Sequence, residues 1–111
     1  MAEAMNEGEY QKRAETAFRA VEKALRDIDA DVVDCDWGGD VMTLTFASGS
    51  RAVINTQRPT RQIWLAAEGR GYHFSFEPAS ATWVEQKPNG LELFSTLRQV
   101  VANEARVDIE F

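Results

Sequence analysis

Apolar residues near the start of the chain recur with the spacing of an amphipathic helix. Intervals of three or four residues separate Tyr10, Ala14, Ala17, Phe18, Val21, Leu25 and Ile28. At about 100° per residue these positions form one stripe about 100° wide, the pattern of a helix that packs on a core by one face. The sequence therefore predicts a first helix that ends near Asp27 or Asp29. The polar segment before it, residues 1–8, is expected to be disordered.

Beyond this helix the period of the apolar residues changes to two, which is typical of strands with one buried face. Short β-favouring segments separated by turn residues predict strands at 33–37, 42–46, 51–55, 62–67, 72–76 and 82–85. A second helix is expected from about Gly90 to Ala105. In the tail that follows, Val107, Ile109 and Phe111 alternate with acidic residues. We expect this tail to lie against the two helices.

The order helix, strands, helix predicts an α+β fold. We expect a two-layer sandwich in which the N- and C-terminal helices pack on one face of a five- to six-stranded antiparallel sheet. The other face of the sheet should be open to solvent. A chain of 111 residues can bury one hydrophobic core, so residues 9–111 are expected to form a single domain.

The connection between the third and fourth strands is unusual. Residues 55–62 contain no aliphatic side chain, and Pro59 in their middle cannot donate to a sheet ladder, which predicts a strand break. In the next strand the period of two places Ile63 and Leu65 toward the core and Trp64 outward beside Gln62. An aromatic ring among amides and arginines has the composition of a recognition patch, although local packing explains it about equally well.

Acidic side chains border the buried stripe of the first helix and continue into the first strand. They are Glu15, Glu22, Asp27, Asp29, Asp31, Asp34 and Asp36. Carboxylates are hard ligands suited to Ca²⁺, Mg²⁺, Mn²⁺ and Fe³⁺, and without histidine among them the site would be open, hydrated and weak. Charge alone favours a solvated acidic face instead. Two bases interrupt the series, Lys23 and Arg26, and helical spacing predicts ion pairs from Lys23 to Asp27 and from Arg26 to Glu22.

Composition excludes several classes of protein. Eighteen acids against twelve bases give a net charge of −6, which argues against a nucleic-acid binder. No apolar run approaches the ~20 residues of a membrane span, and the acidic start is unlike a signal peptide, so we expect a cytoplasmic protein. Cys35 is the only cysteine, which excludes an intrachain disulfide or a Cys-ligated cluster. The only histidine, His73, fits a strand surface better than a metal site. No catalytic constellation is visible, so an enzyme is not expected.

The residues around the strand break also match a known family. The series Asn55-x-Gln57-x-Pro59-x-x-Gln62-Ile63-Trp64-Leu65, followed by Gly71-Tyr72-His73-Phe74, resembles the signature of the frataxins and of their bacterial CyaY branch. The resemblance covers about residues 5–111 and implies the same sandwich fold. It also implies iron, as Fe²⁺ or Fe³⁺, bound weakly at surface carboxylates for which other divalent cations can substitute. The implied ligands are Glu22, Asp27, Asp29, Asp31, Asp34 and Asp36.

The same resemblance implies a non-catalytic role. A frataxin takes part in and regulates iron–sulfur cluster assembly by docking on the cysteine desulfurase and the scaffold protein. The implied partner-binding residues are Asn55, Gln57, Gln62 and Trp64. We expect a monomer, with iron-dependent oligomers left open. The alternative is a ferroxidase or an iron-storage protein that forms iron-loaded oligomers, which would need a more enclosed site.

Overall fold

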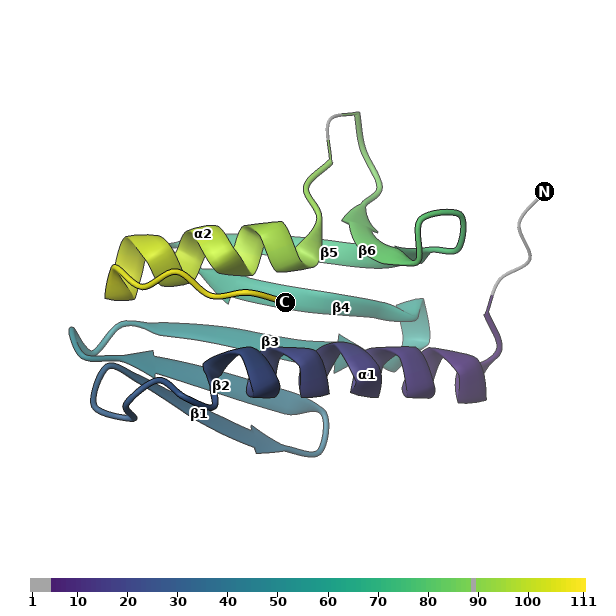
Figure 1. Ribbon diagram of the computed structural model, residues 1–111. Coiled ribbons are helices and arrows are strands. Elements are labelled where there is room, and N and C mark those ends of the chain that lie inside the picture. The colour runs from purple at the N-terminus through teal and green to yellow at the C-terminus, as the bar shows by residue number, and fades with distance from the viewer. Residues whose placement is uncertain (1–4, 89) are drawn as a thin grey trace.

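Two helices cover one face of a six-stranded antiparallel sheet in the computed structural model, which describes residues 5–88 and 90–111 (Figure 1). The strands are β1 (Val33–Gly38), β2 (Val41–Phe46), β3 (Arg51–Gln57), β4 (Gln62–Ala67), β5 (Arg70–Glu77) and β6 (Thr82–Glu85). The helices are α1 (Glu7–Leu25) and α2 (Leu93–Ala105). The strands lie side by side in chain order, from β1 to β6. The predicted α+β sandwich is confirmed.

Helix α1 begins inside the segment that the sequence led us to expect as disordered. The Asn6 side chain accepts a hydrogen bond from the Glu9 N–H at 2.8 Å, and this cap satisfies one of the free N–H groups of the first turn. Met5, just before it, packs against the core. The expectation of disorder is therefore wrong for residues 5–8, and residues 1–4 lie outside the described part of the chain.

The other end of α1 comes earlier than predicted, at Leu25. Beyond it the chain turns through Asp29, whose backbone carbonyl accepts the N–H groups of Val32 and Val33. The Asp29 carboxylate also accepts the Asp31 N–H at 2.8 Å. Short acidic side chains of this kind offer the backbone local partners that compete with a continuing helix.

The core lies between the inner face of the sheet and both helices. Strand side chains at every second position are buried there, and the largest of them are Met42, Leu44, Ile54, Ile63, Leu65 and Phe74. The helices supply Tyr10, Phe18, Val21, Leu93, Leu97 and Val101. Full burial of one such apolar side chain contributes about 1.5–3 kcal/mol. The period-two and helical patterns thus identified the buried faces correctly.

The strand break at Pro59 is confirmed, although β3 is longer than expected. The strand continues to Gln57, and Pro59 then lies within the 3₁₀ helix η1 (Arg58–Thr60). Arg61 follows in the left-handed conformation, with φ 50°, and turns the chain into β4. As a result Asn55 lies opposite Trp64, and Gln57 lies opposite Gln62.

Helix α2 begins at Leu93 and not at Gly90 as predicted. Its cap is Glu92, whose carboxylate accepts the N–H groups of Phe94 and Ser95. The residues just before the cap pair with β6 instead of being helical, because the Glu85 N–H donates to the Leu91 carbonyl at 2.9 Å and Val84 lies opposite Glu92.

The tail after α2 packs as expected. Arg106 is left-handed, with φ 57°, and reverses the chain, which then runs back beside α2 on the side that faces α1 (Figure 1). Ile109 is buried in the core, and Phe111 stacks on Phe94 with ring centroids 4.3 Å apart. None of the helices in residues 5–88 and 90–111 is long and apolar enough to cross a membrane.

Candidate functional site

Trp64 lies on the sheet face that neither helix covers, as its position between Ile63 and Leu65 predicted. Its indole ring stacks on His73 of β5, with centroids 4.0 Å apart and 9° between the planes. Its Nε1–H donates to Gln62 Oε1 at 2.9 Å, and Gln62 Nε2 in turn donates to Ser75 Oγ at 3.1 Å. The ring is half-buried because it lies flat across its neighbours. The predicted outward direction of Trp64 is confirmed, and the ring also packs against its neighbours; its role in recognition stays a prediction.

Asn55 and Gln57 extend this surface on the neighbouring strand. Each lies opposite a residue of β4, Trp64 and Gln62 respectively, and both side chains are half-buried. The four predicted partner-binding residues therefore share one face of two paired strands. His73 and Ser75 of β5, which the sequence did not point to, lie beside Trp64 and Gln62 on the same face. We call the whole set the amide–indole patch: Asn55, Gln57, Gln62, Trp64, His73 and Ser75.

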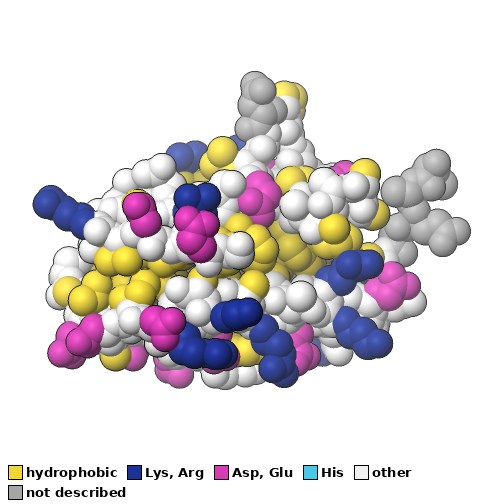
Figure 2. Space-filling model, viewed as in Figure 1, with side chains coloured by type: hydrophobic (Ala, Val, Ile, Leu, Met, Phe, Trp, Pro, Cys, Tyr) yellow, Lys and Arg dark blue, Asp and Glu magenta, His cyan; other side chains and the backbone are white. Residues whose placement is uncertain are grey.

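The predicted metal ligands form an exposed acidic ridge. All six side chains are exposed, and they run from the end of α1 through the following loop into β1: Glu22, Asp27, Asp29, Asp31, Asp34 and Asp36. In Figure 2 acidic side chains gather with basic ones at the lower left, over the end of α1 and this loop. No three His, Cys, Asp or Glu side chains among the described residues converge to hold a metal ion. The ridge is thus an open series of carboxylates and not a preformed cage.

Three of these acids come close to one thiol. Burial, together with the negative charges of Glu22, Asp34 and Asp36, raises the pKa of Cys35 to about 11. The thiol is therefore protonated at neutral pH. The Cys35 side chain is half-buried. Its surroundings show that an acid of α1 lies near the acids of β1.

The two bases of the ridge do not form the predicted ion pairs. Neither the Lys23–Asp27 pair nor the Arg26–Glu22 pair approaches within 4.0 Å, although Arg19 and Glu15 do pair at 2.6 Å with the same spacing. The Lys23–Asp27 pair reaches past the end of the helix, so helical geometry no longer holds those two side chains together, and Arg26 is itself the C-cap residue. Glu15, expected beside Glu22, is engaged by Arg19.

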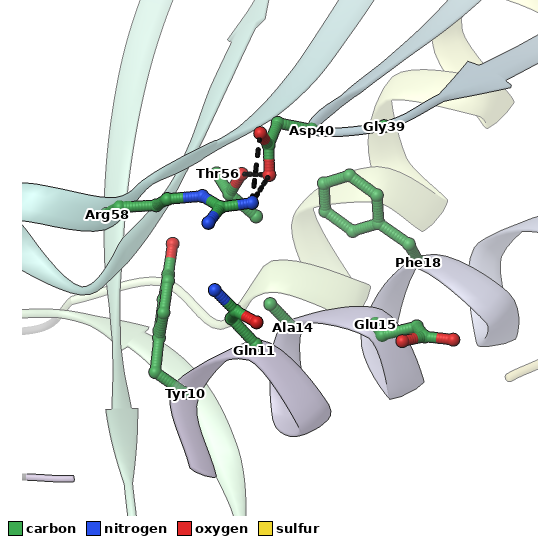
Figure 3. Close-up of a pocket in the computed structure, with 9 residues that line it drawn as sticks. All are labelled: Tyr10, Gln11, Ala14, Glu15, Phe18, Gly39, Asp40, Thr56 and Arg58. Carbon is green, nitrogen blue, oxygen red and sulfur yellow. Dashed lines mark hydrogen bonds and ion pairs between the residues drawn. The ribbon is translucent and has the colours of Figure 1, made fainter. Parts of the chain in front are cut away.

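A cavity of about 200 Å³ lies between the first half of α1 and the turns at one end of the sheet (Figure 3). Its residues are Tyr10, Gln11, Ala14, Glu15, Phe18, Gly39, Asp40, Thr56 and Arg58. The Asp40 carboxylate accepts the Thr56 hydroxyl at 2.6 Å and Arg58 Nη2 at 3.2 and 3.3 Å. The hydrogen bond from Thr56, followed by that from Arg58, lowers the pKa of Asp40.

Tyr10, on the same side of α1, donates its hydroxyl to the Gln62 carbonyl at 2.6 Å and so ties the helix to β4. Burial raises the pKa of the Tyr10 hydroxyl. Asp40 and Arg58 of the cavity are thus paired with each other. They fasten the turn between β1 and β2 to the end of β3. The sequence did not point to this cluster.

Comparisons with known proteins identify a family that this chain matches over nearly its whole length. Residues 3–107 match the family model described as a frataxin-like domain. The relatives include proteins named iron-sulfur cluster assembly protein CyaY. One, from Paraburkholderia phymatum, is 36% identical over 106 residues and covers 96% of this chain and 97% of its own. One from Vibrio cholerae is 37% identical over 107 residues and covers 96% and 99%.

Solved structures agree with the sequence relatives. Frataxin from Psychromonas ingrahamii superposes with a TM-score of 0.85 at 26% identity, over 96% of this chain and 97% of that one. A trimeric frataxin from the yeast Saccharomyces cerevisiae, complexed with ferrous iron, gives a TM-score of 0.62 at 25% identity, over 96% and 92%.

Proposed function

The chain belongs to the frataxin family, and on that basis we propose that it binds iron weakly at the acidic ridge and regulates iron–sulfur cluster assembly. It does so by docking on the cysteine desulfurase and its scaffold protein. Iron is a cargo in this proposal, and the protein acts in the cytoplasm without a catalytic step of its own. The relatives named as cluster assembly proteins support the general role, and the ferrous complex of the yeast relative supports iron as the metal.

The observation that carries the proposal is the exposure of all six ridge acids in a chain that matches a frataxin-like domain over residues 3–107. Exposed carboxylates keep their water and bind hard cations with little selectivity. Fe²⁺ and Fe³⁺ therefore compete there with other cations. Such a site can release its metal easily, which suits a protein that passes iron on.

Docking is supported by the rigidity of the amide–indole patch. Stacking on His73 and a hydrogen bond to Gln62 hold Trp64 in one orientation, so little side-chain freedom is lost when a partner covers it. The net charge of −6 favours a partner with a basic surface, since complementary charge speeds and orients association.

An anaerobic titration with Fe²⁺, followed by amide NMR signals, tests the metal site. The first signals to change should be those of Glu22, Asp27, Asp29, Asp31, Asp34 and Asp36. The effect should weaken at acid pH and at high salt, because protons and ions compete for open carboxylates. A first response at His73 would move the site away from the ridge and overturn the assignment.

Binding to purified cysteine desulfurase, with and without Fe²⁺, tests the docking step. Failure to bind in either condition would overturn it. The ferroxidase alternative predicts oxygen consumption over many turnovers with excess Fe²⁺, above the rate in buffer. Sedimentation with and without iron tests for iron-dependent oligomers. The reason to measure them is that the yeast relative is trimeric.

A further inference from the structure

Strand β5 is longer than the strand that pairs with its outer edge. It spans Arg70–Glu77, but β6 pairs only with the half from Phe74 to Glu77. The remaining half, Arg70–His73, pairs with β4 on one side only. In Figure 1 this half of β5 passes behind α2, with no strand drawn beyond it.

The peptide groups of Gly71 and His73 point to this free edge. The Glu85 N–H donates to the Leu91 carbonyl on the side of β6 that faces away from β5. Peptide groups alternate along a strand, so those of Val84 face β5, where they meet Ser75. The same alternation directs Gly71 and His73 outward. Within residues 5–88 and 90–111, their backbone groups make no hydrogen bond outside the sheet.

The two edges of the sheet differ in how they discourage pairing. The opposite edge strand, β1, carries Asp34 and Asp36, and charged side chains are a common protection of an exposed edge. The segment Arg70–His73 has no acid, and its one arginine, Arg70, stands at the start of the segment. A side chain at Gly71 would meet nothing within 4 Å, so that strand face is open.

A cavity lies on each side of this edge. On the helix side, one of about 340 Å³ has an apolar wall formed by Tyr72, Leu91 and Val100. Leu91 is one of the few large apolar side chains that are strongly exposed, at 42%. On the other side, one of about 360 Å³ is lined by His73, Gln86 and Lys87. Alternate side chains of an added strand would enter the two cavities in turn.

Arg70 supplies a charge at the end of the edge. Its guanidinium lies over the Tyr72 ring, 5.1 Å from the centroid, on the helix side. No carboxylate among the described residues lies within 4.0 Å of it. Glu68, the nearest acid in sequence, accepts weak hydrogen bonds from Asn103. An added strand with an acidic side chain would complement Arg70.

We propose that the free edge of β5 binds an extended peptide segment of a partner protein. The segment adds a strand in line with β6 and pairs with Gly71 and His73. It places an aliphatic side chain against Tyr72, Leu91 and Val100, and an acidic side chain at Arg70 on the same face. This surface is separate from the acidic ridge, and its occupation does not depend on iron.

The test begins with a phage library of random linear nonapeptides selected on the full chain. Enriched peptides should combine alternating aliphatic residues with an acid. Synthetic copies should perturb the amide signals of Gly71 and His73. Methylation of single peptide nitrogens should weaken binding at every second position only, which is the signature of an added strand. Equal effects at all positions, or no enrichment over a blank support, would overturn the proposal.

Two variants locate the site. Gly71→Pro removes the edge N–H without touching the ladder to β4, and Arg70→Glu reverses the charge on an exposed side chain. Each should weaken peptide binding at least tenfold. The control Arg51→Glu makes the same charge change on another exposed arginine and should leave binding unchanged. Peptide binding that survives Arg70→Glu in a folded protein would contradict the assignment. If the parent protein forms a dimer that Gly71→Pro abolishes, the free edge of β5 binds a second copy of this chain. That result would also overturn the proposal.

Discussion

The indole of Trp64 and the imidazole of His73 form a parallel stack, 4.0 Å between centroids, on the open face of the sheet. The two rings come from paired strands and hold each other in place. A hydrogen bond to Gln62 fixes the indole in its plane. The largest side chain of the amide–indole patch is therefore already ordered before a partner arrives.

Replacement of this anchor should weaken docking without unfolding the protein. Trp64→Ala is expected to reduce affinity for the desulfurase by more than about 1 kcal/mol, as for an ordered aromatic anchor. Trp64→Phe keeps a ring on His73 but loses the donor to Gln62, and should lose less. Thermal unfolding and titration calorimetry measure the two effects. Collapse of the fold, with unchanged affinity per folded molecule, would show that Trp64 acts only in packing.

The bases within the acidic ridge should limit its affinity for metal. Lys23→Glu combined with Arg26→Asp makes the local charge more negative by four units, so it should give tighter or additional metal binding. Neither base forms an ion pair within the described part of the chain. The metal-free protein should therefore lose stability mainly through new repulsion between exposed charges, and salt should reduce this loss. Saturating metal should reduce it as well.

Calorimetric metal titrations and thermal melts, at low and high salt, check this double variant. The matched control is Arg51→Glu with Arg98→Asp, which changes two exposed bases outside the ridge by the same charge. Equal metal affinity in the double variant and the parent would make the ridge a solvated face only.

Asp40 should stabilise the fold in a pH-dependent way. Its pKa in the folded state is lowered, so the folded protein favours the ionised form. The contribution is present above the unfolded pKa of about 3.9 and is lost as the pH falls through the lower folded value. Asp40→Asn should therefore cost up to about 1 kcal/mol at pH 7, as for an exposed pair.

Urea denaturation at several pH values from neutral to about 2.5 measures this gap, which should close at the acid end. Asp36→Asn is the control, since Asp36 is exposed and makes no hydrogen bond or ion pair from its side chain among the described residues. A gap that stays constant with pH would mean that the Asp40 carboxylate charge is not what stabilises the turn.

The tail after α2 should contribute to stability through one residue. Ile109 is 3% exposed, so Ile109→Ala should cost about 2–5 kcal/mol by leaving a cavity. Phe111 is 42% exposed and stacks on Phe94, so Phe111→Ala should cost only about 0.5–1.5 kcal/mol. Urea unfolding compares them, and equal losses would contradict the burial of Ile109.

The sequence predicted the helices and strands well because each apolar pattern repeats over many residues. It failed where a single side chain determines the residue at which a helix begins or ends. Asn6 and Glu92 cap the two helices at positions that periodicity does not mark. Beyond Leu25, Asp29 likewise accepts backbone hydrogen bonds in place of a continuing helix. These ends depend on single hydrogen bonds, which leave no repeat in the sequence.

Within the candidate site, the outward direction of Trp64 was predictable from the sequence. The position of His73 opposite it was almost predictable too. Glu68 and Gly69, with φ of 54° and 74°, form a two-residue turn, and such a turn fixes the register that places His73 opposite Trp64. The link from Asp40 to Arg58 was not predictable in this way. It joins the turn before β2 to the end of β3, and only the folded backbone brings those ends together.

The order of the strands in the sheet, which equals their order in the chain, has a consequence for how the protein is made. Every ladder is closed by a short local turn, so each hairpin can form as soon as its second strand has emerged from the ribosome. Nascent chains can thus extend the sheet one strand at a time. The first helix has the opposite fate, because it is synthesised before any of the strands that cover its apolar stripe. A chaperone that acts on this protein during translation would therefore find its target in α1.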